Sequence, residues 1–261
     1  PAQAWNAAGH RLVVLMADPE LTPAARAALQ PLLGGERLVD AAVWLDEEKD
    51  VLAARIPGSR RWHYDARPLC EPAAGPERWC RGGHCASEQL RRHLAVLADG
   101  DAGPDARRFA LRVVLHLVAD VHQPLHAAND DDGGGNDRPV TWPGARRPVN
   151  TSLHAAWDGA LLREAVRGGD ERALARQWWQ AVPAARRAAW AGTDVAAWVE
   201  ESHGLARRQA YGALPGWRCG ATPAARLELD TGYRADAQAL MREQLVKAAV
   251  RLAALLNRTL R

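Results

Sequence analysis

The stretch Leu115-His116-Leu117-Val118-Ala119-Asp120-Val121-His122-Gln123-Pro124-Leu125-His126 carries three histidines and an aspartate in an otherwise apolar run. An apolar helix of this kind is buried, and buried ionisable side chains need partners. His116 and Asp120 are four residues apart, so on a helix they point to one place. Pro124 ends or bends that helix, which lets His126 return toward the same point. This arrangement is typical of a metal site.

A second segment repeats the pattern. His154 and Asp158 are also four residues apart, on another predicted helix with apolar neighbours. Two such helices indicate more than one metal ion. A single His-x-x-x-Asp pair also fits a surface pair, and a lone buried histidine also fits a satisfied core residue. The specificity of the signal therefore lies in the combination.

Length and composition favour one globular domain. The chain has 261 residues, of which 48% are hydrophobic and 25% charged, and no linker or repeat divides it. No apolar run approaches the roughly 20 residues that span a bilayer, so we expect a soluble protein without stable membrane association. The net charge of +3 is weak evidence for a polyanionic partner.

Export is indicated by the cysteines and by the first residues. The four cysteines match no zinc motif, so disulfides in an oxidising compartment are the better account, with free buried thiols as the alternative. Residues 1–4 end in an Ala-x-Ala pattern directly before Trp5, as after signal cleavage, although an alanine-rich chain also offers this by chance. We expect residues 1–4 to be a remnant of that region and residues 5–261 to form the domain.

Apolar periodicity and capping residues predict an all-α, compact multi-helix domain with long loops. The predicted helices cover residues 6–18, a segment starting at Thr22-Pro23, and residues 87–98, 105–121, 151–166, 171–182, 194–214 and 230–260. The last of these has a long apolar stripe that should pack centrally.

Further candidates lie outside the two helical pairs. His10 lies on the first helix and, taken alone, is an unremarkable surface histidine; Asp46 ends an apolar turn, where a solvated carboxylate is the usual explanation. His63 is a plausible ligand in a short extended or loop segment. The glycines of residues 129–137 permit close approach to a ligand, although an exposed flexible loop is the alternative.

Taken in order, these residues resemble the zinc-dependent type I nucleases, the secreted single-strand-specific nuclease and 3′-nucleotidase family with the phospholipase C/nuclease fold. The resemblance is most specific at residues 119–126 and 150–158. The resemblance implies three zinc ions. One is held by Asp46, His63, His116 and Asp120. A second shares Asp120 and adds His10 with the amino nitrogen and carbonyl oxygen of Trp5, and the third uses His126, His154 and Asp158.

The resemblance also implies roles around the metals. Asp46 would orient the attacking water, and Lys49 would stabilise the charged phosphoryl transition state. The base-binding positions are Tyr64, Asp65, Asn136 and Asp137. The disulfides pair Cys80 with Cys85 and Cys70 with Cys219.

Two departures from the family pattern concern these roles. Tyr64-Asp65 follows His63 one residue sooner than the usual spacing, which puts the role of Asp65 in doubt. Four residues precede Trp5, and an internal peptide nitrogen cannot supply the amine ligand.

The implied function is that of a secreted or periplasmic, monomeric phosphodiesterase. It would hydrolyse single-stranded DNA and RNA to 5′-phosphorylated products, and 3′-nucleotides, through a trinuclear zinc site and zinc-activated water. A zinc phospholipase C acting on lipid head groups is the alternative enzyme. A zinc-storing or structural protein is a third class, although closed structural sites are usually rich in cysteine.

Overall fold

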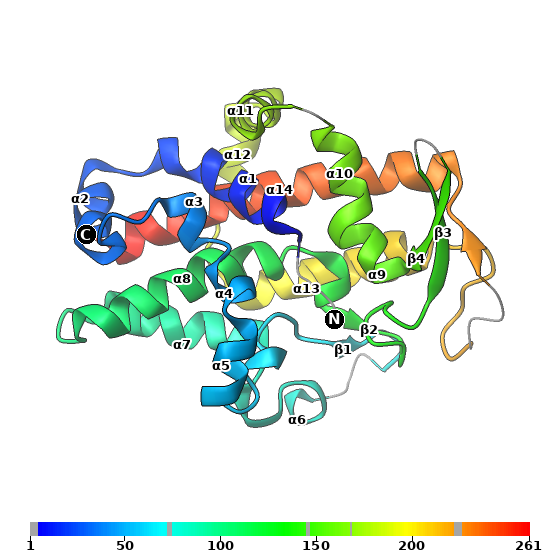
Figure 1. Cartoon of the computed structure of the whole chain (residues 1–261), viewed down its shortest axis with the longest axis horizontal. Helices are drawn as coiled ribbons and strands as arrows, with labels where there is room; N and C mark the ends of the chain where they lie inside the picture. Colours follow the sequence, from blue (N-terminus) through cyan, green and yellow to red (C-terminus); the bar gives the residue numbers. More distant parts are fainter. Residues whose placement is uncertain (1–4, 72–74, 145–146, 168, 222–225) are drawn as a thin grey trace.

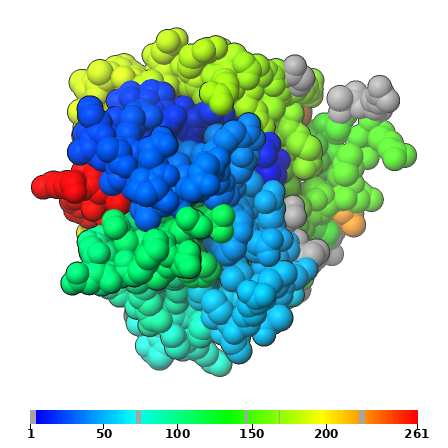
Figure 2. Space-filling view, turned by 60° about the vertical axis from the view of Figure 1, so that its left-hand side comes forward, coloured from blue at the N-terminus to red at the C-terminus, as the bar shows by residue number. Residues whose placement is uncertain are grey.

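The computed structural model describes residues 5–71, 75–144, 147–167, 169–221 and 226–261. Helices make up most of the molecule, and α14 runs along its long axis with other helices on either side (Figure 1). The all-α prediction is confirmed. In the space-filling view the N-terminal segments cover one face beside α7 and α8, and the C-terminal end lies at its edge (Figure 2).

The α-helices follow the chain from end to end. They are α1 (Ala7–Ala17), α2 (Pro23–Leu33), α3 (Leu38–Ala41), α4 (Trp44–Glu47), α5 (Lys49–Arg55), α6 (Pro76–Trp79), α7 (Ala86–Ala98), α8 (Pro104–Asp120), α9 (Leu153–Ala155), α10 (Leu161–Val166), α11 (Glu171–Ala181), α12 (Ala184–Trp190), α13 (Val195–Leu205) and α14 (Thr231–Thr259). Short 3-10 turns are η1 (Asp18–Glu20), η2 (Ser59–Arg61), η3 (Arg81–Gly83) and η4 (Pro124–His126), and π-helical turns are η5 (Ala156–Ala160) and η6 (Ala206–Tyr211).

The strands are short and lie mainly at one end of the helical bundle (Figure 1). They are β1 (Arg67–Pro68), β2 (Ala128–Asn129), β3 (Pro139–Pro143), β4 (Pro148–Ser152) and β5 (Leu227–Glu228). β1 pairs with β2 in parallel, while β3 pairs antiparallel with β4 and parallel with β5.

The hairpin corrects one sequence prediction. The helix predicted for residues 151–166 begins only at Leu153, because Thr151 and Ser152 belong to β4 and pair with β3. The Ser152 hydroxyl accepts a hydrogen bond from the Ala155 backbone N–H and so caps the helix start. Helix α12 was not predicted from the sequence; its N-cap position is Pro183, whose side chain makes no capping bond.

Helix α8 ends as the sequence predicts. It starts at Pro104, which suits the first position of a helix, and its regular hydrogen bonding stops near Asp120. Single turns then lead to η4 at Pro124: the Gln123 N–H donates to the Asp120 carbonyl, and the His126 N–H donates to that of Gln123. The chain therefore reverses within six residues and brings His126 back beside Asp120.

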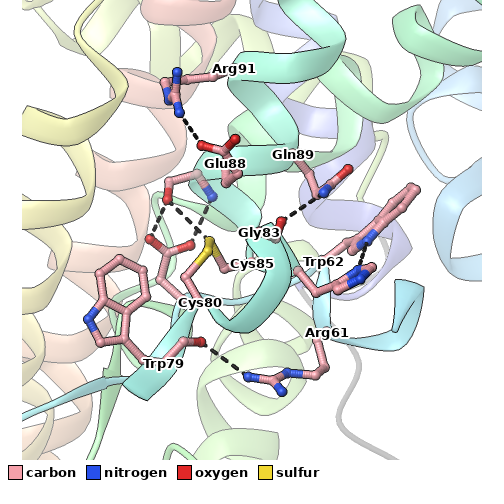
Figure 3. Close-up of a disulfide and its surroundings, with 12 residues drawn as sticks. Arg61, Trp62, Trp79, Cys80, Gly83, Cys85, Glu88, Gln89 and Arg91 are labelled. Carbon is pink, nitrogen blue, oxygen red and sulfur yellow. Dashed lines mark hydrogen bonds and ion pairs between the residues drawn. A yellow bond between two sulfur atoms is a disulfide. The ribbon is translucent and has the colours of Figure 1, made fainter. Parts of the chain in front are cut away.

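The cysteines form the two expected disulfides, Cys70 with Cys219 and Cys80 with Cys85. The second closes a small loop at the start of α7, where the Gln89 side-chain amide donates to the Gly83 carbonyl (Figure 3). None of the helices in the described ranges has both the length and the apolar character needed to cross a membrane.

The two bridges should differ in their effect on stability. They span 149 and 5 residues. On loop-closure entropy alone, removing the long bridge costs about 5 kcal/mol and removing the short one about 2 kcal/mol. We expect Cys70→Ala/Cys219→Ala to lower the thermal midpoint more than Cys80→Ala/Cys85→Ala in unfolding at fixed zinc concentration. Equal losses would contradict this account.

Candidate metal centre

Eight ligand-type side chains from distant parts of the chain lie close together, and most of them are buried. They come from α1, α4, the segment after η2, α8, η4 and the α9–η5 helix, and form three groups. The groups are His10, His116 and Asp120; Asp46, His63 and His116; and His126, His154 and Asp158. Within each group the candidate ligand atoms lie within 4.8 Å of one another. The structure thus brings together all the predicted side-chain ligands.

Asp120 lies where the groups meet. Its Oδ1 atom is 3.5 Å from His10 Nε2, and its Oδ2 atom is 3.2 Å from both His63 Nδ1 and His116 Nε2. His126 Nδ1, in the third group, is 3.7 Å from Asp120 Oδ1. The carboxylate is fully buried. One carboxylate with an oxygen toward each of two groups can bridge metal ions.

Backbone carbonyls orient three of the histidines. Nδ1 of His116 donates to the Ala42 carbonyl, at 2.8 Å, and Nδ1 of His154 to the Gly134 carbonyl, at 2.7 Å. His126 Nδ1 likewise donates to the His63 carbonyl at 2.8 Å. Each bond keeps a proton on Nδ1, so Nε2 is the nitrogen that can bind a metal ion once it is deprotonated, the arrangement usual in metal sites.

Several buried polar atoms of these groups have no hydrogen-bond partner among the described residues. They are both ring nitrogens of His10, Asp120 Oδ1, and Nε2 of His126 and of His154. An unpaired buried polar atom costs about 1–3 kcal/mol. So many in one place are explained if they bind a group from outside the chain. Imidazole and carboxylate are the donors that divalent zinc takes at catalytic sites.

Burial and neighbouring charge shift the protonation of this centre. Burial alone lowers the pKa of His116, but the adjacent Asp120 carboxylate outweighs it and raises that pKa to about 9. Burial would raise the pKa of Asp120, but the neighbouring His116, His63 and His10 together hold that pKa well below its usual value. Burial, and then His116, lower the pKa of His10. Asp120 is therefore ionised and available to a cation.

A cavity of about 370 Å³ opens beside the third group. Its lining combines one aromatic ring, two amides and small residues: Tyr64, Ala66, Leu125, Ala128, Asn129, Gly133, Gly134, Asn136 and His154. Gly134 has φ +66°, and a Cβ there would lie 2.9 Å from the Leu125 carbonyl oxygen, so only glycine fits. The cavity can hold a flat ring next to the candidate metal ligands.

Two of the predicted base-binding residues do not line this cavity. The Asp65 carboxylate is buried and accepts hydrogen bonds from the Ser87 backbone N–H, at 2.8 Å, and hydroxyl, at 2.6 Å. Asp65 thus anchors the start of α7. The chain turns at the next residue, Ala66, whose φ is +45°. Asp137 is exposed on the glycine-rich loop. The other two predicted residues, Tyr64 and Asn136, do line the cavity.

Lys49 is the first residue of α5, three residues after Asp46. It is half-buried, and its ammonium forms no ion pair with any carboxylate in the described ranges. Its positive charge is thus not taken up by a carboxylate of the described residues.

Gln123 belongs to the site although it was not predicted. It is fully buried, and its amide nitrogen donates to Asp158 Oδ1 at 2.7 Å while its amide oxygen accepts from the Leu125 N–H at 2.6 Å. It therefore orients one candidate ligand and shapes the turn after α8. The sequence offered one signal for this role, a side-chain amide within an apolar run that is expected to be buried.

The fold and the site define an all-α protein built around three groups of buried histidines and aspartates. Comparison of the sequence with known families makes this specific: residues 5–261 match the S1/P1 Nuclease model, and the chain belongs to that family. The predicted family resemblance is confirmed.

Curated relatives include fungal and plant proteins. The chain is 29% identical to Nuclease S1 of Aspergillus oryzae over 63% of its own length and 56% of that protein's. It is 26% identical to Nuclease P1 of Penicillium citrinum over 67% and 64%, respectively. With Endonuclease 4 of Arabidopsis thaliana the identity is 27% over 98% of this chain and 89% of that protein. The matches thus span less than two thirds of the two fungal nucleases.

Proposed function

We propose that this protein is a zinc-dependent hydrolase that cleaves phosphodiester bonds in single-stranded DNA and RNA, leaves 5′-phosphorylated products, and also hydrolyses 3′-nucleotides. The observation that carries this proposal is the meeting of three ligand groups at Asp120, next to a cavity that fits a base. Membership of the S1/P1 nuclease family, and relatives named nuclease and endonuclease, support nucleic acid as the substrate.

Three zinc ions fit the donor chemistry. One ion would be held by Asp46, His63, His116 and Asp120, and a second by Asp120, His10 and Trp5. The third would be held by the third group, His126, His154 and Asp158. The partnerless buried nitrogens and the carboxylate oxygen support this assignment. All the side-chain donors are nitrogen or oxygen, which suits a catalytic zinc site better than a closed, thiolate-rich structural one.

Trp5 is held next to this centre. Its indole N–H donates to the Ala119 carbonyl at 3.1 Å, and the following Asn6 N–H donates to the Asp158 carbonyl at 3.0 Å. We include its amino nitrogen and carbonyl oxygen as ligands, which requires a chain that starts at Trp5; residues 1–4 lie outside the described residues. Zinc titration of chains starting at Pro1 and at Trp5 tests this, and equal affinities would exclude the amine.

When bound, zinc supplies Lewis-acid polarisation of the phosphoryl group and lowers the pKa of water. The residues of the chain do the rest. Asp46 is partly exposed at the edge of the centre, so it can orient the attacking water and accept its proton. Lys49 offsets negative charge that grows on the phosphoryl oxygens in the transition state.

The cavity supplies the preference for single strands. Tyr64 can stack on a base, and the Asn136 amide can hydrogen-bond to its edge. A base can enter only after it leaves the duplex stack, which costs a few kcal/mol in a double strand and little in a single strand.

The disulfides support an oxidising compartment as the location of the enzyme. Two bridges join all four cysteines, and such bridges persist in oxidising environments. We propose a secreted or periplasmic location and a monomeric enzyme. Size-exclusion chromatography with light scattering checks the second point, and a dimer mass would contradict it.

Parallel digestion of single-stranded DNA, duplex DNA and a phosphatidylcholine emulsion tests the proposed substrate class. We expect fast hydrolysis of the single strand to 5′-phosphorylated products, slow hydrolysis of the duplex, and none of the lipid. Asn136→Ala should raise KM for single strands, whereas Asn150→Ala, on the exposed hairpin, should not. Preferential hydrolysis of the lipid would support the phospholipase alternative instead.

A further inference from the structure

A buried carboxylate outside the metal centre holds the glycine-rich loop. Asp132 has only 4% of its surface exposed. Its Oδ1 accepts from the Tyr211 hydroxyl and from the Gly135 backbone N–H, both at 2.8 Å. Its Oδ2 accepts from Arg138 Nε at 2.9 Å. Tyr211 lies 79 residues away at the end of η6, so this network ties the loop to a different part of the bundle.

The arginine of the network is itself held firmly. Arg138 is 3% exposed, its Nη2 donates to Asp130 Oδ2 at 3.0 Å, and its guanidinium lies 5.2 Å from the centre of the Tyr211 ring. The Trp217 indole N–H donates to the same Asp130 oxygen at 2.8 Å. Bonds between charged groups at this burial are strong only when every partner is present.

The loop gains from such support because glycine-rich backbone loses more conformational freedom on ordering than any other. Asp131, Gly133, Gly134 and Gly135 have φ of +54°, +64°, +66° and +87°. The glycines adopt this region without steric cost, whereas for Asp131 it costs about 1 kcal/mol or more. Bonds from outside the loop therefore help to hold it in this shape.

The loop in turn grips His154 at two points. The Gly134 carbonyl accepts from His154 Nδ1 at 2.7 Å, and the Gly135 carbonyl accepts from the His154 backbone N–H at 3.1 Å. Asp132 binds the N–H of the same Gly135. A shift of the loop would thus release the bond that aims His154 Nε2 at Asp158, 3.0 Å away.

We propose that Asp132 is a positioning residue for His154, and that Tyr211 and Arg138 act through it. The inference rests on the proposed function in that His154 would hold one of the zinc ions. Partners that orient a metal-binding histidine typically contribute 10–100-fold to metal affinity. The effect should be confined to the third group, because His10, His63 and His116 make no contact with this loop among the hydrogen bonds of the described chain.

Two variants remove different numbers of hydrogen bonds from the network. In Asp132→Asn one carboxylate oxygen becomes an amide nitrogen, which cannot accept from Gly135, Tyr211 or Arg138, so at least one donor is unpaired. Tyr211→Phe removes one hydroxyl only. Tyr233→Phe is the matched control: this buried hydroxyl donates to the Ala210 carbonyl and accepts from the Trp157 indole, and among the described residues it makes no hydrogen bond to the loop.

Zinc titration of the metal-free variants against a chromophoric chelator gives the first readout. We expect Asp132→Asn to lower the affinity for one of the three zinc ions by about 10–100-fold, with a smaller loss of affinity in Tyr211→Phe. Tyr233→Phe should lower the thermal midpoint and leave all three affinities unchanged. Unchanged zinc binding in Asp132→Asn would overturn the proposal, as would an equal loss at all three sites, which would show a purely structural role.

Nitrogen-15 spectra of the histidine side chains give a second readout without zinc or substrate. In the metal-free parent protein the His154 Nδ1 proton should be hydrogen-bonded and slow to exchange. Faster exchange is expected in Asp132→Asn but not in Tyr233→Phe, and an unchanged signal would overturn the proposal. If the parent protein binds no zinc, the proposed function fails while this measurement still decides the role of Asp132.

Discussion

Chelation of zinc should abolish hydrolysis of single-stranded DNA and lower the thermal midpoint in the same titration. The ligand groups join α1, α4, α8 and the α9–η5 helix, so metal binding is coupled to the packing of the bundle. A zinc ion at a free concentration of 100 times its Kd adds about 2.7 kcal/mol to the free energy of unfolding. In a domain of this size that corresponds to roughly 5–11 °C per ion.

The controls separate metal loss from other damage. Restored zinc should recover both rate and midpoint, whereas added magnesium should not, because buried imidazole nitrogens suit zinc and not magnesium. Native metal analysis should find about three zinc ions per chain. Full activity in protein freed of metal would refute the proposed function.

Helical periodicity predicted the fold because the bundle is built mostly from local hydrogen bonds and packs around the long helix α14, one face of which is apolar. The same periodicity paired His116 with Asp120 and His154 with Asp158, since four residues make about one turn. The hairpin escaped prediction because the strand character of residues 148–152 depends on pairing with β3, which no local pattern reports.

Side-chain direction limited the rest of the site prediction. Asp65 lies next to the cavity-lining Tyr64, but its carboxylate points to Ser87, 22 residues later in the chain. The network of Asp132 depends on Tyr211, 79 residues away. Sequence spacing reports which residues share a helix face, whereas these partners are set by how separate elements pack.

Asp120→Ala should impair the enzyme far more than Lys49→Ala. Removing the carboxylate takes away the anionic partner of His10, His63 and His116 together, so we expect fewer than three zinc ions and a rate loss on the order of 10⁴-fold or more. Lys49→Ala removes one charge that acts in the transition state. The expected loss is about 10²–10³-fold in kcat, with zinc content unchanged.

Three further variants show what each change removes. Asp120→Asn keeps the shape but not the charge, so zinc loss there assigns the effect to the anion. Lys49→Arg keeps the charge and should recover part of the rate lost in Lys49→Ala. Asp50→Ala deletes an exposed carboxylate beside Lys49 that pairs only with Arg60 among the described residues, and it should stay close to the parent rate. Near-normal turnover in both Asp120→Ala and Lys49→Ala would place the active site elsewhere, because neither the Asp120 carboxylate nor the Lys49 charge would then serve the reaction.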